Sequence, residues 1–496
     1  MRGGMPKSSP AILLLVLTLA GAGAGVWLAT KPVNQSPLPA GPLPAIAQNS
    51  PAEDLPAQIR LLEGQIEYLQ GQNAALEEEN EQLRRRIAEA GGKGMPKMDA
   101  ATGGTTPDFE GLTLDLMRHR QLKALPLPTT PATLRDVEDR ILAWLRARQP
   151  GDEALRFALA LTALGWIEQP VDPLPLRAAL LARQLGGWFD TRTGLLHLVE
   201  ADPASGQPAP DHPLAIAFGQ VLREYGATLF PPGRPLSTDA LLARESLLAG
   251  DAGLTRFLLS LQNTAAQAPP SIPGEDPDHP LNQVPMPVFL KELAFFPFHR
   301  GFEFAQSLHS ADGFPQLDAA YSRPPASSAE IIQPALYLES PPVSADAAPA
   351  SARPAAPELE GSAPYWDDSL GRFAAFTALR AHNSDDTAGA AAKGLVSDRL
   401  LAYAAPEHPR DHAVWHTTLT DPAAADAFFK AMRAALISRY DVKAATDAPE
   451  KLILHDRNRR IHLSRAGAQV LLVDAAGENA ARALQAAFPA PKEGAP

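Results

Sequence analysis

The sequence contains no cysteine. This absence excludes disulfide bonds, zinc sites built from thiolates, a cysteine nucleophile and a lipidated N-terminal cysteine. Basic residues are in deficit, since 44 Lys and Arg stand against 56 Asp and Glu, for a net charge of -12. Because nucleic-acid binding depends mainly on Lys and Arg, we expect no nucleic-acid partner. The sequence also lacks a Gly-x-Ser-x-Gly elbow, a phosphate-binding loop and a nicotinamide fingerprint, so it shows no machinery for nucleophilic catalysis.

Proline, in contrast, is abundant. The chain has 50 prolines in 496 residues, which is about twice the usual share. Residues 32–54 are predicted to form a proline-rich tether, and residues 339–364, which contain few large apolar side chains, a linker. A chain of this length is expected to fold into about three units, and these two stretches separate them.

The first segment with a defined character is residues 8–30, which carry no charged side chain and lie between Lys7 and Lys31. About 20 apolar residues suffice for a helix that spans a bilayer, and a positive flank keeps the N-terminus in the cytoplasm. We therefore predict a transmembrane signal anchor with the rest of the chain outside the cytoplasm. The alternative is a cleavable signal peptide and a secreted protein, because Ala22-Gly23-Ala24 resembles a cleavage site.

Residues 55–90 have a seven-residue repeat. Leucine fills one core position of each heptad, and isoleucine or asparagine fills the other. A repeat with Leu at d and Ile or Asn at a is typical of a parallel two-stranded coiled coil, in which each buried Asn pairs with its twin. A single amphipathic helix that packs on its own protein is the alternative. The predicted dimerisation residues are Leu55, Ile59, Leu62, Ile66, Leu69, Asn73, Leu76, Asn80, Leu83 and Ile87.

Residues 108–338 are mostly helical by pattern, because apolar residues recur on one face of successive segments. Residues 187–199, with a Thr-Arg-Thr-Gly turn in the middle, are predicted to form a β-hairpin. The predicted helices cover residues 130–145, 154–164, 174–185, 213–225, 238–261 and 287–308.

Residues 365–490 mix helical and strand patterns and are predicted to form a small domain. The fold class predicted for the globular chain is therefore α+β. In this domain the predicted helices are residues 367–380, 386–392, 421–439 and 478–488, and the predicted strands are residues 399–404, 413–418, 452–455, 460–464 and 468–473.

A series of short motifs follows in order along residues 108–440. The motifs are Trp188-Phe189-Asp190, Ala217-Phe218-Gly219-Gln220-Val221-Leu222-Arg223, Ser246-Leu247-Leu248-Ala249-Gly250-Asp251-Ala252, Phe296-Pro297-Phe298-His299-Arg300-Gly301, Pro324-Pro325-Ala326-Ser327-Ser328-Ala329-Glu330, Gln333-Pro334-Ala335-Leu336-Tyr337, Ser369-Leu370-Gly371-Arg372-Phe373, Ser397-Asp398-Arg399 and Val414-Trp415-His416-Thr417. Their order resembles a family of uncharacterised bacterial extracytoplasmic proteins that are similar to zincin-type metallopeptidases.

The zinc chemistry of that family is missing here. The resemblance places the two histidines of the family's His-Glu-x-x-His motif at Phe218 and Leu222, its catalytic glutamate at Gly219 and its acidic ligand at Ala249. A catalytic zinc needs about three nitrogen or oxygen ligands, and a general base to activate its water. None of these four residues supplies either, so the resemblance implies a degenerate, zinc-free metallopeptidase-like domain. Phe218 and Leu222 are expected to be buried on the inward face of their helix.

The spacing of the other histidines does not indicate a replacement metal site. His412 and His416 have helix-like spacing but lie in a predicted strand, where four residues span about 13 Å, so we expect exposed strand histidines rather than joint ligands. His299 and His309 could approach a cleft, but no pair of carboxylates with metal-ligand spacing accompanies them.

Two acidic residues near the lost motif are also interpreted as structural. Glu224 is the only acid close to Gly219 on its helix, and it is expected to face solvent. Asp251 keeps a position of the family's motif, and its expected role is hydrogen bonding or packing within the helices.

Together these patterns predict a noncatalytic protein without a cofactor or bound metal. It is expected to be anchored in the bacterial inner membrane, to lie mainly in the periplasm, and to act as a dimeric binding or scaffolding module. Its expected partners are a second copy of itself, the membrane, and a protein or peptide ligand. The first alternative is a hydrolase or peptidase with a relocated metal or acid/base site. The second is a structural spacer in which the coiled coil does the work.

Overall fold

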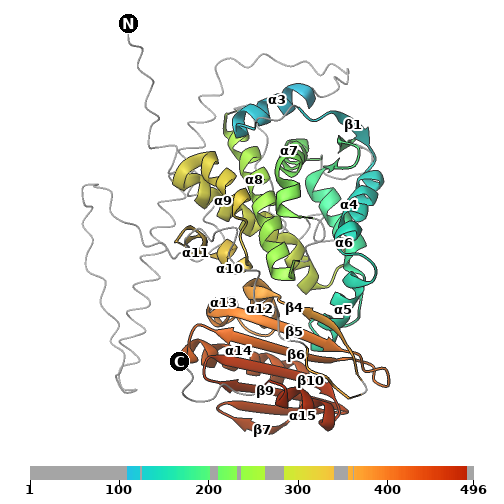
Figure 1. Ribbon diagram of the computed structural model, residues 1–496, viewed down its shortest axis with the longest axis vertical. Coiled ribbons are helices and arrows are strands. Elements are labelled where there is room, and N and C mark those ends of the chain that lie inside the picture. Colours follow the sequence, from blue (N-terminus) through green and yellow to red (C-terminus); the bar gives the residue numbers. More distant parts are fainter. Residues whose placement is uncertain are drawn as a thin grey trace, which may run out of the picture. The chain divides into compact units, whose positions relative to one another are not determined.

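The computed structural model describes residues 109–122, 126–200, 210–231, 236–262, 284–339, 356–360 and 362–488 (Figure 1). The predicted anchor (8–30), tether (32–54) and coiled coil (55–90) lie outside these residues. None of the helices that the structure describes is long and apolar enough to cross a membrane. The described residues belong to one compact unit, and they confirm the α+β class.

The N-terminal part of this unit is built mainly from helices that share one apolar core. Three of them begin with a side-chain cap. Thr133 forms a capping box with Asp136 at the start of α4, and Asp172 and Asp211 cap α6 and α7 next to a proline in the first turn. The helices are α3 (Phe109–Arg120), α4 (Leu134–Arg148), α5 (Glu153–Leu164), α6 (Pro173–Leu185), α7 (His212–Leu229), α8 (Thr238–Gln262), α9 (Val288–Ser322), α10 (Ser328–Ile332) and α11 (Pro334–Glu339).

A three-stranded sheet lies against α4 and α7. Its strands are β1 (Thr129–Ala132), β2 (Gly187–Asp190) and β3 (Leu195–Val199), in the order β1-β3-β2. The antiparallel β2–β3 pair confirms the predicted hairpin. The helix predicted from residue 130 is wrong at its start, because residues 129–132 pair in parallel with β3 and the helix begins only after its cap at Thr133.

The C-terminal part contains a seven-stranded antiparallel sheet, drawn in orange and red in Figure 1, with the order β4-β5-β6-β10-β9-β8-β7. Helix α14 packs on one face, where the ring of Phe428 meets that of Trp415. Helix α15 packs on the other face, against Leu471 and Val473. The elements are β4 (Pro364–Asp368), α12 (Gly371–Arg380), α13 (Asp385–Lys393), β5 (Leu395–Tyr403), β6 (His412–Leu419), α14 (Pro422–Tyr440), β7 (Ala444–Ala448), β8 (Lys451–Asp456), β9 (Arg459–Ala466), β10 (Gln469–Ala476) and α15 (Glu478–Ala486).

Two predictions for this part were wrong. Residues 367–380 are not one helix, because the chain first completes strand β4, which pairs with β5, and the helix begins at Gly371. His412 and His416 do lie in a strand, but they are not exposed. His412 is 6% exposed, and its Nδ1 accepts a hydrogen bond from the Ala476 N–H at 3.0 Å. His416 is half-buried beside the ring of Phe488, because α15 and the chain after it cover this face.

Candidate functional site

The positions that the resemblance assigns to zinc chemistry lie on two neighbouring helices, α7 and α8. Phe218, Leu222 and Ala249 are 6%, 2% and 2% exposed. Gly219 is enclosed as well, since a Cβ placed there would lie 3.1 Å from side-chain atoms of Leu127 and Phe189. A glutamate could not replace this glycine without displacing the core. All four positions are therefore filled by packed apolar groups.

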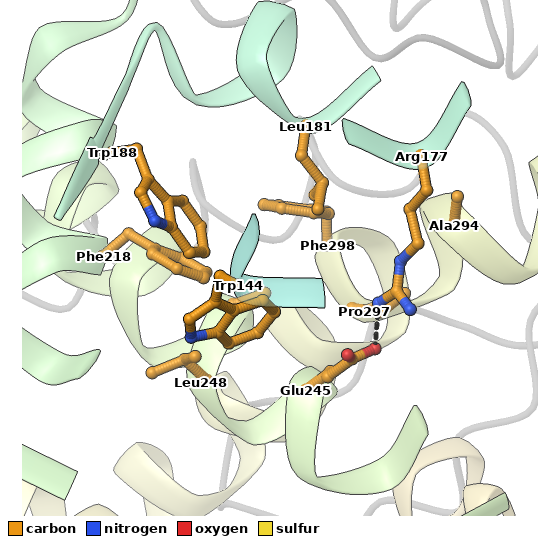
Figure 2. A pocket seen from close by; sticks show the side chains of 11 residues that line it. Trp144, Arg177, Leu181, Trp188, Phe218, Glu245, Leu248, Ala294, Pro297 and Phe298 are labelled. Atoms are coloured by element: carbon orange, nitrogen blue, oxygen red, sulfur yellow. Dashed lines mark hydrogen bonds and ion pairs between the residues drawn. The ribbon is translucent and has the colours of Figure 1, made fainter. Parts of the chain in front are cut away.

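Phe218 and Ala249 line a pocket, whereas Gly219 and Leu222 do not. Figure 2 shows this pocket, which is small: the space in it that water molecules could occupy is about 20 Å³. Its apolar wall is aromatic. The ring of Trp188 lies 5.0 Å from that of Trp144 and 5.6 Å from that of Phe218, and Phe298 completes the wall. The pocket thus offers flat apolar surfaces at the place where the resemblance puts a metal.

Charged residues are gathered beside these rings. Arg177 of α6 forms an ion pair with Glu245 of α8, and both side chains line the pocket (Figure 2). Arg148, at the end of α4, lies over the rings of Trp144 and Phe230, with its guanidinium carbon 3.5 Å and 4.3 Å from the two ring centres. Burial is the main cause that lowers the pKa of Arg148 to about 10, with Glu245 acting against it and Arg177 with it. Arg148 remains a cation at neutral pH.

Sequence reasoning did not find these residues. Trp144 and Arg148 are four residues apart on α4, which places them on one helix face, but nothing in the sequence relates them to α6 or α8. The sequence indicates Glu245 only weakly: this acidic residue lies one helical turn before Ala249, the position that the resemblance assigns to the family's acidic ligand. The pocket is lined by residues of helices α4, α6, α7, α8 and α9 and of strand β2, which are spread over more than 150 positions of the chain.

The histidines and carboxylates that the structure describes do not form a replacement metal site. Among the residues that the structure describes, no group of three or more His, Asp or Glu is arranged to hold a metal ion. His299 and His309 both lie on α9, ten residues apart, which is about 15 Å along a helix. His309 packs with its ring 4.8 Å from that of Phe314, and burial lowers its pKa. Glu224 is exposed, as predicted.

Asp251 has a different role from its neighbour Ala249. It is fully buried and accepts two hydrogen bonds from the equally buried Arg120, at 2.7 and 2.8 Å. The Tyr321 hydroxyl donates to the same carboxylate at 2.9 Å. Asp318 accepts from both Arg120 and the Tyr225 hydroxyl at 2.7 Å. This cluster joins α3, α7, α8 and α9, so Asp251 stabilises the packing of the helices, in line with its expected structural role.

The three motifs of the C-terminal part meet at one carboxylate. Asp398 of β5 accepts hydrogen bonds from the Ser369 hydroxyl at 2.7 Å, the Leu370 N–H at 2.9 Å and the Gly371 N–H at 3.0 Å. The indole N–H of Trp415 donates to it at 2.9 Å. The donors of these hydrogen bonds lie at the start of α12 and on strand β6. The three motifs therefore hold the start of α12 against the sheet.

The same junction ties the helical part to the sheet. The Ser328 N–H donates to Asp239 at 2.8 Å, and the Ser328 hydroxyl accepts from the Phe373 N–H at 3.1 Å. Gly371 has a φ of 80°, and a Cβ placed there would lie 1.8 Å from Oδ1 of Asp239. Only glycine fits this close approach. The motif around Gly371 is therefore explained by packing.

Comparison with known proteins adds one finding. Residues 364–485, which contain the whole seven-stranded sheet, α12 to α14 and all but the last residue of α15, are similar to a domain of unknown function, DUF8575. No curated protein and no solved structure matches the chain.

Proposed function

We propose that the chain is a noncatalytic binding or scaffolding protein, in which residues 108–338 form a metallopeptidase-like part without zinc. One observation carries this proposal. Phe218, Leu222 and Ala249 are buried apolar side chains at the positions where the resemblance requires metal ligands, and Phe218 and Ala249 line an aromatic pocket. Zinc binds to nitrogen, oxygen and thiolate ligands, none of which these three residues can offer.

The proposal extends to the membrane and to self-association. Residues 8–30 would anchor the chain in the bacterial inner membrane, and residues 55–90 would pair two copies in parallel, with the globular residues outside the cytoplasm. Sedimentation of the full chain in detergent tests the second part. A chain that remains monomeric at high concentration would rule the dimer out, and a dimer that persists after the heptad leucines are replaced by serine would assign pairing to another segment.

Thermal melts test the absence of zinc. A protein that binds zinc in its folded state gains about 2.7 kcal/mol at a hundredfold excess of metal over the dissociation constant. We expect no change in the melting temperature of the full chain when zinc or a chelator is added. We also expect Phe218→Ala to destabilise the fold by about 3 to 5 kcal/mol, because a buried aromatic ring is lost.

Glu224→Ala is the matched control, since this exposed residue lies on the same helix and its replacement should have little effect. A reproducible rise in melting temperature with zinc, abolished by His299→Ala or His309→Ala, would refute the proposal and favour a hydrolase with a relocated metal site.

A further inference from the structure

Three arginines gather near the C-terminal end of α5, the helix that lies against strands β4, β5 and β6 (Figure 1). Arg410 stands just before β6, Arg439 lies in the last turn of α14, and Arg459 begins β9. Asp474 of β10, which is 2% exposed, forms ion pairs with Arg410 and Arg459. Arg439 forms no ion pair with any residue that the structure describes. Positive charge therefore exceeds negative charge in this cluster.

Arg459 is fully occupied within the fold. Its Nε and Nη2 donate to the carboxylate of Asp474, and its Nη1 donates to the carbonyls of Arg410 and Asp411 at 2.7 and 2.9 Å. Arg459 alone thus balances the charge of Asp474. A second carboxylate, Asp456, acts on Arg410 but forms no ion pair with it.

The other two arginines come together beside Gly165, the residue that follows α5. An ideal Cβ at Gly165 would lie 1.2 Å from Nη2 of Arg439 and 2.8 Å from Nη1 of Arg410. Each guanidinium is held by its other terminal nitrogen, since Nη1 of Arg439 donates to the Leu164 carbonyl and Nη2 of Arg410 donates to the Tyr440 hydroxyl at 2.7 Å. The two nitrogens near Gly165 make no hydrogen bond with any described residue. They are close enough for one small anion to accept from both.

This proximity is unfavourable without a counterion, because like charges disfavour each other. Burial lowers the pKa of Arg439, and the charges of Arg410 and Arg459 lower it further, against Tyr440 and Asp474. The end of α5 supplies only about half a negative charge. Both Arg410 and Arg439 are half-buried, so a ligand can reach them from solvent.

The charge and the donors restrict the ligand to one chemical class. Two guanidinium groups present several N–H donors from two directions, which suits an anion with several oxygen atoms. A surplus of more than one positive charge favours a dianion over a carboxylate or chloride. We propose that Arg410 and Arg439 bind a phosphate or sulfate group beside Gly165. This site is separate from the aromatic pocket and does not depend on the proposed binding or scaffolding function.

Calorimetric titration of the full chain in detergent tests the site. The probes are sodium sulfate and sodium phosphate, with sodium chloride at equal ionic strength as the control. Because calorimetry measures binding directly, it is not confused with the general stabilisation that sulfate exerts on proteins. We expect sulfate and phosphate to bind saturably at one site, at least tenfold more tightly than chloride. Phenyl phosphate separates the two sources of this chemistry: affinity equal to that of phosphate indicates a phosphate group on a larger ligand, and weaker binding a free anion.

Four variants assign the contacts. Arg410→Gln and Arg439→Gln should each weaken sulfate binding about tenfold, because each removes a charged hydrogen-bond donor. Arg410→Lys keeps the charge without the second terminal nitrogen and should recover part of the affinity. Arg433→Gln is the matched control, since this arginine of α14 pairs with Asp447 and carries the same charge. It should have no effect.

Arg439→Gln also removes a hydrogen bond to the end of α5, so the two Arg410 variants decide the matter if it fails to fold. Chloride binding as tight as sulfate binding would overturn the site, and so would an unchanged sulfate affinity in Arg410→Gln. An equal loss in Arg433→Gln would also overturn it, because net charge rather than position would then set the affinity. None of these outcomes affects the zinc melts.

Discussion

At the scale of single residues, the pair formed by Arg120 and Asp251 is the most enclosed charge interaction among those described. Their side chains are 1% and 0% exposed. Removal of one partner from a buried pair leaves the other charge without compensation and costs about 3 to 5 kcal/mol. We expect Asp251→Asn to lower the free energy of unfolding by about 3 kcal/mol, the lower end, because Asp318 still accepts a hydrogen bond from Arg120. Urea unfolding of the full chain measures this loss.

Arg300 and Glu303 on α9 provide the comparison. They also form an ion pair, at 2.7 Å, but both side chains are largely exposed. An exposed pair of this kind contributes at most about 1 kcal/mol, so Glu303→Gln should have little effect. Similar losses for the two variants would show that burial does not set the value of the Arg120–Asp251 pair.

Some of these buried residues could be predicted from the sequence, but the residues that they contact could not. The burial of Phe218 and Leu222 could be predicted, because they are four residues apart on an apolar helix face. A structural role for Asp251 could be predicted too, but its partner Arg120 could not, since the two residues are separated by 131 positions. The pairing of Arg177 with Glu245 could not be predicted for the same reason, since 68 positions separate them. Long-range polar contacts leave no periodic signal in a sequence.

At the scale of elements, helices α8 and α9 approach each other through glycines in two of the sequence motifs. A Cβ placed at Gly250 would lie 2.0 Å from the carbonyl oxygen of Gly301, and one placed at Gly301 would lie 2.2 Å from that of Ser246. Alanine is normally better than glycine inside a helix, by about 1 kcal/mol. Here the collision with a backbone oxygen should outweigh this gain. We expect Gly250→Ala to destabilise the chain by about 1 to 3 kcal/mol in urea unfolding.

Gly253, one turn later on α8, is the matched control. The nearest atom to a Cβ at this position is Cδ2 of Phe302 at 3.5 Å, which is an ordinary contact. Gly253→Ala should therefore be neutral or stabilise the chain by up to about 1 kcal/mol. If Gly250→Ala also stabilised the chain, the close approach of α8 and α9 would be wrong.

The elements themselves were predictable to the extent that their sequences are periodic. The helices expected at residues 154–164, 174–185 and 238–261 occur almost as predicted, because each carries a continuous apolar face. Strands β1, β4 and β7 were missed. Their sequences, such as Ala-Ala-Thr-Asp-Ala in β7, show no alternation of apolar and polar residues, and each is an edge strand that pairs on one side only. Their place in the sheets is set by their neighbours rather than by their own composition.

At the scale of the whole described unit, the junction between the helical part and the sheet contains buried carboxylates. Burial raises the pKa of Asp368 to about 7, and the nearby Asp398 adds to this effect. Burial likewise raises the pKa of Asp239 to about 6, with contributions from Asp398 and Glu330. Hydrogen bonds from Thr238 to Asp368 and from Ser328 to Asp239 act in the opposite direction.

Three buried or half-buried histidines on the sheet have the opposite influence on the pH dependence of stability. Burial lowers the pKa of His412, His416 and His462, so the folded state favours their neutral forms. Their contribution is present above the ordinary histidine pKa and is lost as the pH falls below it. The pH profile of the native chain alone therefore mixes two opposed effects in the same range, and only a comparison with a variant separates them.

Asp368→Asn provides that comparison. The pKa of Asp368 is raised in the folded state, so its contribution to stability is fully present below the unfolded value near 4 and is lost as the pH rises through about 7. The variant cannot ionise at this position and keeps an oxygen that can accept from the Thr238 N–H. We expect the native chain to lose stability relative to Asp368→Asn between pH 5 and pH 8 in urea unfolding. Asp385→Asn, at an exposed position on α13, controls for the loss of one negative charge. Parallel curves for the native chain and Asp368→Asn would show that Asp368 ionises without cost, and that the junction is open to water.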